Sequence, residues 1–211
     1  MSLGLAGLVG CSGEPESVTK EKTVAAAGLC GGAVSADAAK ALQLISGAEK
    51  FEPTGKDSTT VNAVQKLIDN FSPLSEKPSM VPEDLCRIYP GDESNHEEIR
   101  IQFHLVYGKL AETGGDLASG LRAFRMGEKA SAGSDRSFLQ FACTSDKLTG
   151  SSESPAHVEV LISQRKAPEG DTEELRSAQA ALVHSVSLSM ARESGCADDG
   201  GLEERPALKP E

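Results

Sequence analysis

The stretch IRIQFHLVY, residues 99–107, decides the fold of this chain. Its apolar side chains recur at every second position, and they are Ile99, Ile101, Phe103, Leu105 and Tyr107. Successive side chains of a β-strand point to opposite faces of a sheet, so this spacing puts the apolar set on one face. The stretch therefore predicts a strand that turns one face toward a hydrophobic core.

Other stretches with the composition of strands lie on both sides of this one. They are residues 85–89, 121–126, 137–143 and 157–163. Loops rich in Gly, Ser and Asp separate the later ones, at a spacing that is typical of hairpins. The sequence therefore predicts an antiparallel sheet of about five strands.

Two helices are predicted before the sheet. In residues 34–47, Ser35 can cap the first turn and Gly47 suits the left-handed position after the last. The second helix begins near Thr60 and ends before Pro73, which cannot continue it. Each helix has one apolar stripe, so each needs a neighbouring layer to cover it.

The longest helix is predicted near the C-terminus, over residues 171–195. Asp171 and Glu174 have the spacing of a capping box, and Gly195 ends the helix. Its predicted buried face consists of Leu175, Ala178, Leu182, Val186 and Ser189. We therefore expect an α+β domain of two layers, with three helices packed on one face of the antiparallel sheet.

The composition argues against several classes of function. The 211 residues suit one domain, and their formal charge of -11 repels nucleic-acid phosphates, so we expect no nucleic-acid partner. No tryptophan is present, although sugar-binding surfaces commonly stack sugars on aromatic rings. After the first ten residues, no apolar run approaches the roughly 20 residues that cross a bilayer.

The residues before Cys11 have the composition of an export signal. They end in LVGC, residues 8–11, which resembles the lipobox of bacterial lipoproteins, in which the cysteine takes a diacylglycerol and becomes the first residue. A signal peptide also needs a basic start, whereas the first basic residue here is Lys20. Either the true start lies upstream of Met1, or this is an ordinary flexible terminus with a stray cysteine.

The other cysteines are Cys30, Cys86, Cys143 and Cys196. They lack the close spacings that zinc requires, so two disulfides in an oxidising compartment are favoured over reduced, buried thiols. Three pairings are possible. Because Cys30 precedes the first helix and Cys196 follows the last, we predict Cys30–Cys196, which leaves Cys86–Cys143 between two strands.

These features divide the chain into four parts. Residues 1–10 form a truncated-looking lipoprotein signal segment, and residues 11–27 a lipidated cysteine with a flexible polar tether. Residues 28–196 form the disulfide-stabilised domain. Residues 197–211 are acidic and contain proline and glycine, so we expect them to be disordered.

The order of these features resembles the small secreted lipoproteins of actinomycetes, especially streptomycetes. The resemblance rests on the Cys11 box, the tether, Leu29-Cys30-Gly31-Gly32 before a small-residue helix, Phe138–Cys143 in a strand, and Glu193–Cys196 before an acidic tail. It implies an address outside the cytoplasm and disulfides. Most members of this group have no assigned function, so it implies no catalytic residue.

A search for catalytic chemistry finds few candidates. The chain has no G-x-S-x-G elbow, no phosphate loop and no G-x-G-x-x-G. Of the four histidines, His96 is assigned to a solvated acidic loop in preference to a weak cation site, His104 and His157 to the surface, and His184 to the boundary of the long helix. We therefore expect no catalytic residue, no metal site and no cofactor.

We expect a membrane-anchored lipoprotein on the extracytoplasmic face of the cell membrane, acting as a binding or sensing module. Its partners would be the membrane, through the lipid at Cys11, and an envelope protein or a small ligand. A structural or assembly role beside another envelope protein is the alternative. A hydrolytic enzyme is the third hypothesis.

Overall fold

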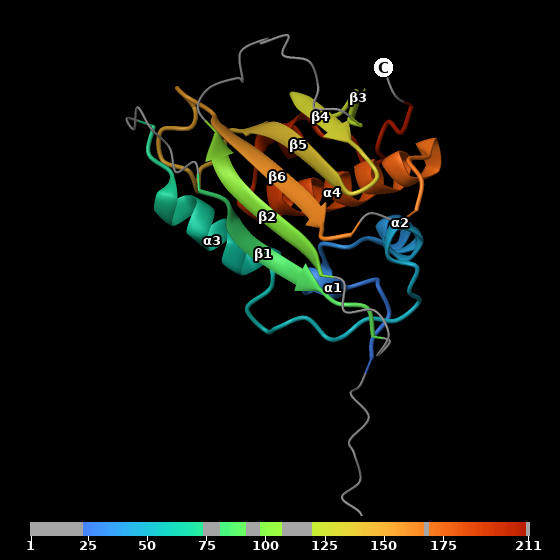
Figure 1. Ribbon diagram of the computed structural model, residues 1–211. Helices are drawn as coiled ribbons and strands as arrows, with labels where there is room; N and C mark the ends of the chain where they lie inside the picture. The colour runs from blue at the N-terminus through green and yellow to red at the C-terminus, as the bar shows by residue number, and fades with distance from the viewer. Residues whose placement is uncertain (1–22, 74–80, 92–97, 107–119, 167–168, 210–211) are drawn as a thin grey trace, which may run out of the picture.

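The computed structural model describes residues 23–73, 81–91, 98–106, 120–166 and 169–209, and it has an α+β fold (Figure 1). Its six strands form one antiparallel sheet in the order β1-β2-β6-β5-β4-β3. The strands are β1 (Glu83–Ile88), β2 (Ile99–Val106), β3 (Arg122–Phe124), β4 (Lys129–Ala132), β5 (Arg136–Cys143) and β6 (Ala156–Gln164). The helices are α1 (Leu29–Gly32), α2 (Ala36–Ser46), α3 (Thr60–Asn70), α4 (Glu173–Ser194) and the 3-10 turn η1 (Ala197–Gly201).

The predicted alternation of β2 is confirmed. This strand pairs with β6 over its whole length, from Ile99 opposite Gln164 to Val106 opposite His157. Ile99, Ile101, Phe103 and Leu105 are buried on the side that faces the helices. Tyr107, which we also placed on this face, lies outside the described residues.

The sheet has one strand more than the roughly five expected, because β4 was missed. This strand has the sequence KASA, whose small side chains give little indication of a strand. Pairing with β5 holds it in place, from Lys129 opposite Gln140 to Ala132 opposite Ser137. In the turn before it, Gly127 has a φ of +57°, and a Cβ there would lie 2.4 Å from the Gln140 carbonyl oxygen, so only glycine fits.

The ends of the helices follow the expected capping chemistry with one change. The Ser35 hydroxyl accepts a hydrogen bond from the Ala38 amide at 3.2 Å, as predicted for the start of α2. At the start of α4, Thr172 and not Asp171 is the cap, and its hydroxyl accepts from the Leu175 amide at 3.2 Å. Asp171 instead accepts a hydrogen bond from Arg176 at 2.8 Å.

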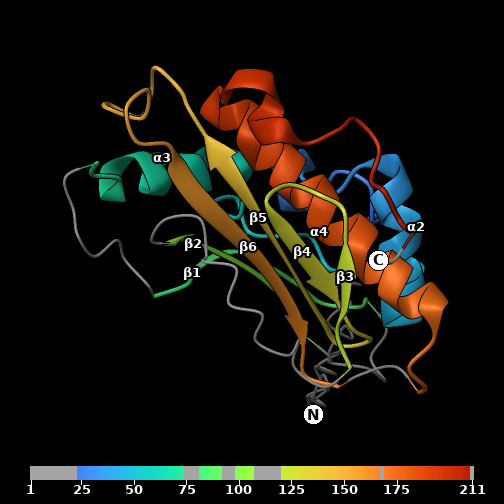
Figure 2. The same cartoon turned by 90° about the horizontal axis from the view of Figure 1, so that it is seen from above.

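The α4 helix is buried far beyond the single stripe that the sequence analysis predicted. The sheet covers one side of it, and α2, α3 and η1 pack against others (Figure 2). Polar residues of α4 such as Gln179, His184 and Ser187 are consequently buried with the apolar ones, whereas Ser189, predicted to be buried, is partly exposed. This helix therefore forms the centre of the domain.

The predicted disulfide pairing is wrong. The bridges are Cys30–Cys86 and Cys143–Cys196, with Cα–Cα distances of 5.6 and 4.8 Å. Because β2 and β6 lie between β1 and β5, Cys86 and Cys143 are three strand spacings apart, about 14 Å, which a disulfide cannot span. Each bridge instead joins a strand to the segment of the helical layer beside it.

The predicted disorder after Cys196 is also wrong over residues 197–209, which the structure describes. The Ala197 amide donates to the Thr144 carbonyl at 2.8 Å, and η1 packs against β5. Leu202 is only 5% exposed, so one apolar side chain fixes this acidic stretch to the domain.

Removing either disulfide should destabilise the domain strongly. Replacing Cys30 and Cys86 together with alanine opens a loop with a sequence separation of 56, for which the chain-entropy model gives about 4 kcal/mol. Chemical denaturation should show this loss in the free energy of unfolding. Cys11→Ser is the control and should leave the stability unchanged.

Peptide mapping under non-reducing conditions tests the pairing itself. We expect linked peptides for Cys30–Cys86 and for Cys143–Cys196. Recovery of a Cys30–Cys196 peptide from native protein would contradict the structure.

Candidate functional site

Two cavities meet at His184, in the middle of α4. The first has a volume of about 410 Å³ and lies between the β3–β4 hairpin and residues 201–207. The second has about 480 Å³ and lies between α2, α4 and residues 204–206. His184 and Arg205 line both cavities, so the two form one groove across α4, divided by the chain's own C-terminal segment, residues 202–209.

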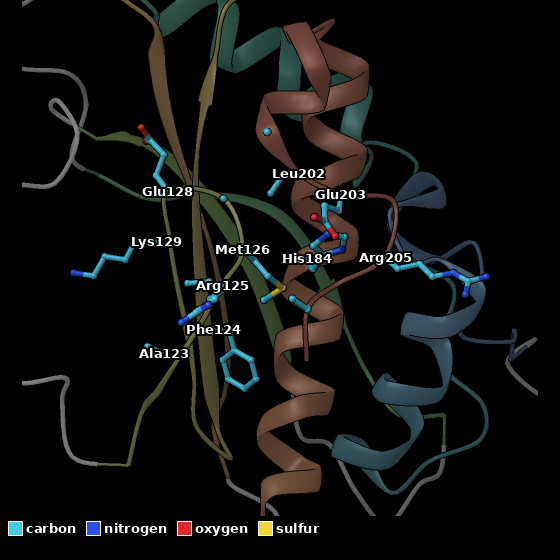
Figure 3. A pocket seen from close by; sticks show the side chains of 14 residues that line it. Ala123, Phe124, Arg125, Met126, Glu128, Lys129, His184, Leu202, Glu203 and Arg205 are labelled. Atoms are coloured by element: carbon cyan, nitrogen blue, oxygen red, sulfur yellow. The ribbon is translucent and has the colours of Figure 1, made fainter. Parts of the chain in front are cut away.

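The hairpin forms one wall of this groove. Phe124 and Met126 project from it on the side of α4, and Met126 reaches toward His184 (Figure 3). Glu128 and Lys129 line the same cavity, but their side chains point away from the helix (Figure 3). Phe124 and Met126 are themselves buried, so the surface that the first cavity exposes is more polar than apolar.

The start of α2 forms the opposite wall, and Ser185 positions it. The Ser185 hydroxyl donates to the Ala33 carbonyl at 2.7 Å and accepts from the Ser35 amide at 3.0 Å. These two bonds fix the residues before α2 to α4, although about 150 positions separate them in sequence. Ser185 thus has a structural role beside His184.

The C-terminal segment lies over the groove and is held at three points. Leu202 is buried, and Figure 3 shows it beside the hairpin wall. Glu203 makes a main-chain hydrogen bond with His184. Glu204 forms an ion pair with Arg192 of α4, which also pairs with Asp199 of η1 at 3.0 Å.

His184 is 3% exposed, and burial lowers its pKa. The hydrogen bond with the main chain of Glu203 and the carboxylates of Glu203 and Glu204 act in the opposite direction, and Arg192 lowers the pKa further. A neutral imidazole can donate one hydrogen bond and accept another, so His184 can orient a polar group of a ligand.

A second cluster of ionisable side chains lies on the sheet face that points away from the helices. His104 of β2 and Glu159 of β6 are opposite each other, with Nε2 and Oε1 3.5 Å apart and side-chain exposures of 9% and 13%. Burial lowers the pKa of His104 and raises the pKa of Glu159, although Lys129 opposes the second shift. Two groups whose pKa values approach each other can exchange a proton.

The hollow that His104 lines has a volume of about 10 Å³, at most the space of one water molecule, and it lies toward α3, without Glu159. The pair itself joins β2 and β6 across the outer face of the sheet. On the same face, His157 Nδ1 lies 2.7 Å from Glu128 Oε2 and ties β6 to the turn before β4. We therefore assign both pairs to the stability of the sheet.

The histidines differ from the positions predicted for them. His104 and His157, predicted at the surface, have side chains that are 9% and 16% exposed, and His184, predicted at the boundary, is buried. His96 and the predicted lipidation site Cys11 lie outside the described residues.

In the described part of the chain, no group of three or more His, Cys, Asp or Glu side chains is placed to hold a metal ion. None of the helices in these ranges has the length and apolar character that a membrane crossing requires.

Comparison with known proteins gives no relative for this chain: no family model, no curated protein and no solved structure matches it.

His184 was missed as a site residue, although the sequence contains an indication of it. No charged residue occurs between Arg176 and Arg192, which is an unusually long neutral stretch for a helix with one solvent-exposed face. This stretch indicates burial on all sides, and a histidine inside it must then be buried as well.

The pH dependence of stability should reveal the buried imidazole of His184. Its folded-state pKa is lowered, so the unfolded chain binds protons more readily, and stability is lost as the pH falls through the unfolded value of about 6.5. The midpoint temperature of thermal unfolding of the wild type should therefore be lower at pH 5.5 than at pH 7.5. These two pH values bracket the pKa of a free histidine, which is about 6.5. His184→Gln should reduce this fall, because glutamine keeps a donor and does not titrate.

His104→Gln is the matched comparison, because burial also lowers the pKa of His104. Each variant should remove part of the fall and the double variant more than either. A wild-type profile that is flat over this range, or one that His184→Gln leaves unchanged, would contradict the assignment.

Proposed function

We propose that this protein is a binding module on the extracytoplasmic face of the cell membrane, anchored by a lipid at Cys11, and that its ligand site is the groove at His184. The observation that carries the proposal is the pair of cavities, about 410 and 480 Å³, that meet at this residue. Ligand sites in proteins have volumes of this order.

The disulfides support the location. Both are consistent with an oxidising compartment outside the cytoplasm, because such bonds are rarely maintained inside it. They use four of the five cysteines, and Cys11 is the remaining one. Its place at the end of LVGC fits the lipid anchor and the resemblance to actinomycete lipoproteins, and both of these stay part of the proposal.

The lining of the groove indicates an amphiphilic ligand. Phe124, Met126 and Leu202 are buried beside His184 and leave a small apolar area in the first cavity. Arg192 and Asp37 offer charge in the second cavity. A ligand that fills both cavities would thus have an apolar part and a polar or charged part.

An enzymatic function is less well supported. The pKa values of His104 and Glu159 are shifted in the directions of an acid–base pair, but neither residue lines any of the cavities of about 410, 440 and 480 Å³. The groove at His184 is large enough for a substrate. However, the hydroxyl of the neighbouring residue Ser185 is already hydrogen-bonded to main-chain groups. Binding therefore remains the function that we propose.

The lipid anchor predicts a change of partition when Cys11 is replaced. In an actinomycete host, the wild-type protein should appear in the membrane fraction and in the detergent phase after Triton X-114 extraction, because a diacylglycerol carries it there. Cys11→Ser should move it to the aqueous phase, while Ser12→Ala should not. If the wild-type protein is found in the aqueous phase and its mass lacks the lipid, the proposed lipid anchor is wrong.

The binding site predicts a stabilised fold in the presence of the ligand. Amphiphilic fragments of the cell envelope should include one that raises the midpoint of thermal unfolding, since a ligand that binds only the folded state stabilises it. Met126→Trp should abolish the shift by filling the first cavity. Val61→Trp, at an exposed position of α3, is the control and should keep it.

If no envelope fragment shifts the midpoint of the wild type, the assignment to small envelope ligands is wrong. If Met126→Trp leaves a shift intact, the ligand binds elsewhere on the domain.

A further inference from the structure

The groove at His184 already contains a peptide, namely the chain's own C-terminal segment. Residues 201–207 contribute to the wall of the first cavity and residues 204–206 to the wall of the second. The segment therefore divides the groove lengthwise without filling it. This arrangement resembles a peptide lying in a binding cleft, with a bend at Glu204 and Arg205 and room left on both sides.

The segment makes three different types of contact with the groove. Leu202 is an apolar anchor beside the hairpin, and the main chain of Glu203 makes a hydrogen bond with His184. Glu204, two positions after the anchor, forms an ion pair with Arg192 of α4. An aliphatic anchor, a main-chain contact and a charge at a fixed distance together define a short motif.

These contacts are too weak to hold the segment permanently. Beyond Leu202, every described residue of the segment except Pro206 is exposed. The ion pair with Arg192 is exposed as well, with side-chain exposures of 45% for Arg192 and 74% for Glu204, and such pairs contribute about 0–1 kcal/mol. Segments with few buried contacts open locally at a small fraction of the global free energy of unfolding.

The segment can leave the groove without unfolding the domain, because the residues before it are fixed to the sheet. The bridge Cys143–Cys196 fixes the backbone to β5 just after α4. Gly200 is held against Phe141 of β5, where a Cβ would lie 2.8 Å from the ring. At Gly201, which has a φ of +74°, a Cβ would meet nothing within 4 Å, so the space around this residue is open. Glycine also has a wider choice of backbone angles than other residues.

We propose that the groove is a peptide-binding site and that residues 202–206 are its built-in and displaceable occupant. Its ligand is a segment of a partner protein in which an aliphatic residue is followed two positions later by a carboxylate. The inference rests on the proposed binding function and names the class of its partner. It also provides a contact surface for the alternative function, a structural or assembly role beside another envelope protein.

Arg192 favours a carboxylate of the ligand at the position of Glu204. When the segment leaves, Arg192 keeps Asp199 as its partner but loses Glu204. Arg205 leaves with the segment, and the charged residues that remain in the second cavity are Arg192, Asp37 and Glu193. A carboxylate beside the guanidinium of Arg192 restores the lost pair. Asp37, Glu193 and Asp199 make the surroundings negative otherwise, so this preference is confined to the one position beside Arg192.

The test supplies the occupant as a separate molecule. A chain that ends at Gly201 has an empty groove, and a synthetic peptide of residues 200–209 should bind it in isothermal titration calorimetry. The full-length chain should bind the same peptide at least about tenfold more weakly, because its own segment competes at a high effective concentration. The matched control peptides carry Leu202→Asp, which should lose binding, or Glu204→Lys, which should weaken binding by up to about fivefold, the most that an exposed ion pair contributes.

A second variant covers the case in which the shortened chain does not fold. Full-length Leu202→Asp should release the segment while keeping the chain length, and it should then bind the wild-type peptide. Circular dichroism and an intact Cys143–Cys196 bridge are the criteria for folding. If either chain folds and does not bind the peptide, the proposal is overturned; it is equally overturned if neither folds, because the segment must be able to leave an intact domain.

Two further results separate this inference from others. If an envelope fragment stabilises the wild type but the peptide fails to bind, the proposed binding function stands and the peptide inference fails. If the wild type forms dimers with rising concentration and the chain ending at Gly201 does not, the occupant is the C-terminal segment of a second copy, and the assignment to a partner protein is wrong.

Discussion

The structure depends on the need to cover α4 on every side. Between Arg176 and Arg192 this helix has no charged side chain, and most of its residues are buried. A single sheet covers only one side of a helix, so α2, α3 and η1 must cover the others. The groove at His184 lies where this cover is incomplete, between the hairpin and α2, and the C-terminal segment extends across the opening.

The two disulfides reinforce this arrangement locally. One joins the turn before α2 to β1 at one edge of the sheet, and the other joins the end of α4 to β5. Neither crosses the sheet from edge to edge. Each bridge therefore fixes one part of the helical layer to the strand beneath it, and the hydrogen bonds of β2 and β6 connect the two parts.

Local patterns in the sequence predicted the fold better than they predicted the site. The alternation in β2, the cap at Ser35 and the glycines after α2 and α4 depend on neighbouring residues, so they could be recognised without knowing the tertiary structure. The disulfide pairing, β4 and the burial of His184 depend on which segments meet in space. The pairing required the strand order, and β4 required its partner β5, because KASA has no strong preference for a strand.

The positions of the disulfides determine how the molecule would respond to a pulling force between its two ends. A force from the N-terminal side would reach Cys30 and pass through the sulfurs to β1, while a force from the C-terminal side would stop at Cys196 and pass to β5. The loops from Cys30 to Cys86 and from Cys143 to Cys196 are thus shielded from extension, and only the chain ends outside them can lengthen first. The sheet between β1 and β5 would then resist the force, so the C-terminal segment could be drawn out of its groove before the core is disturbed.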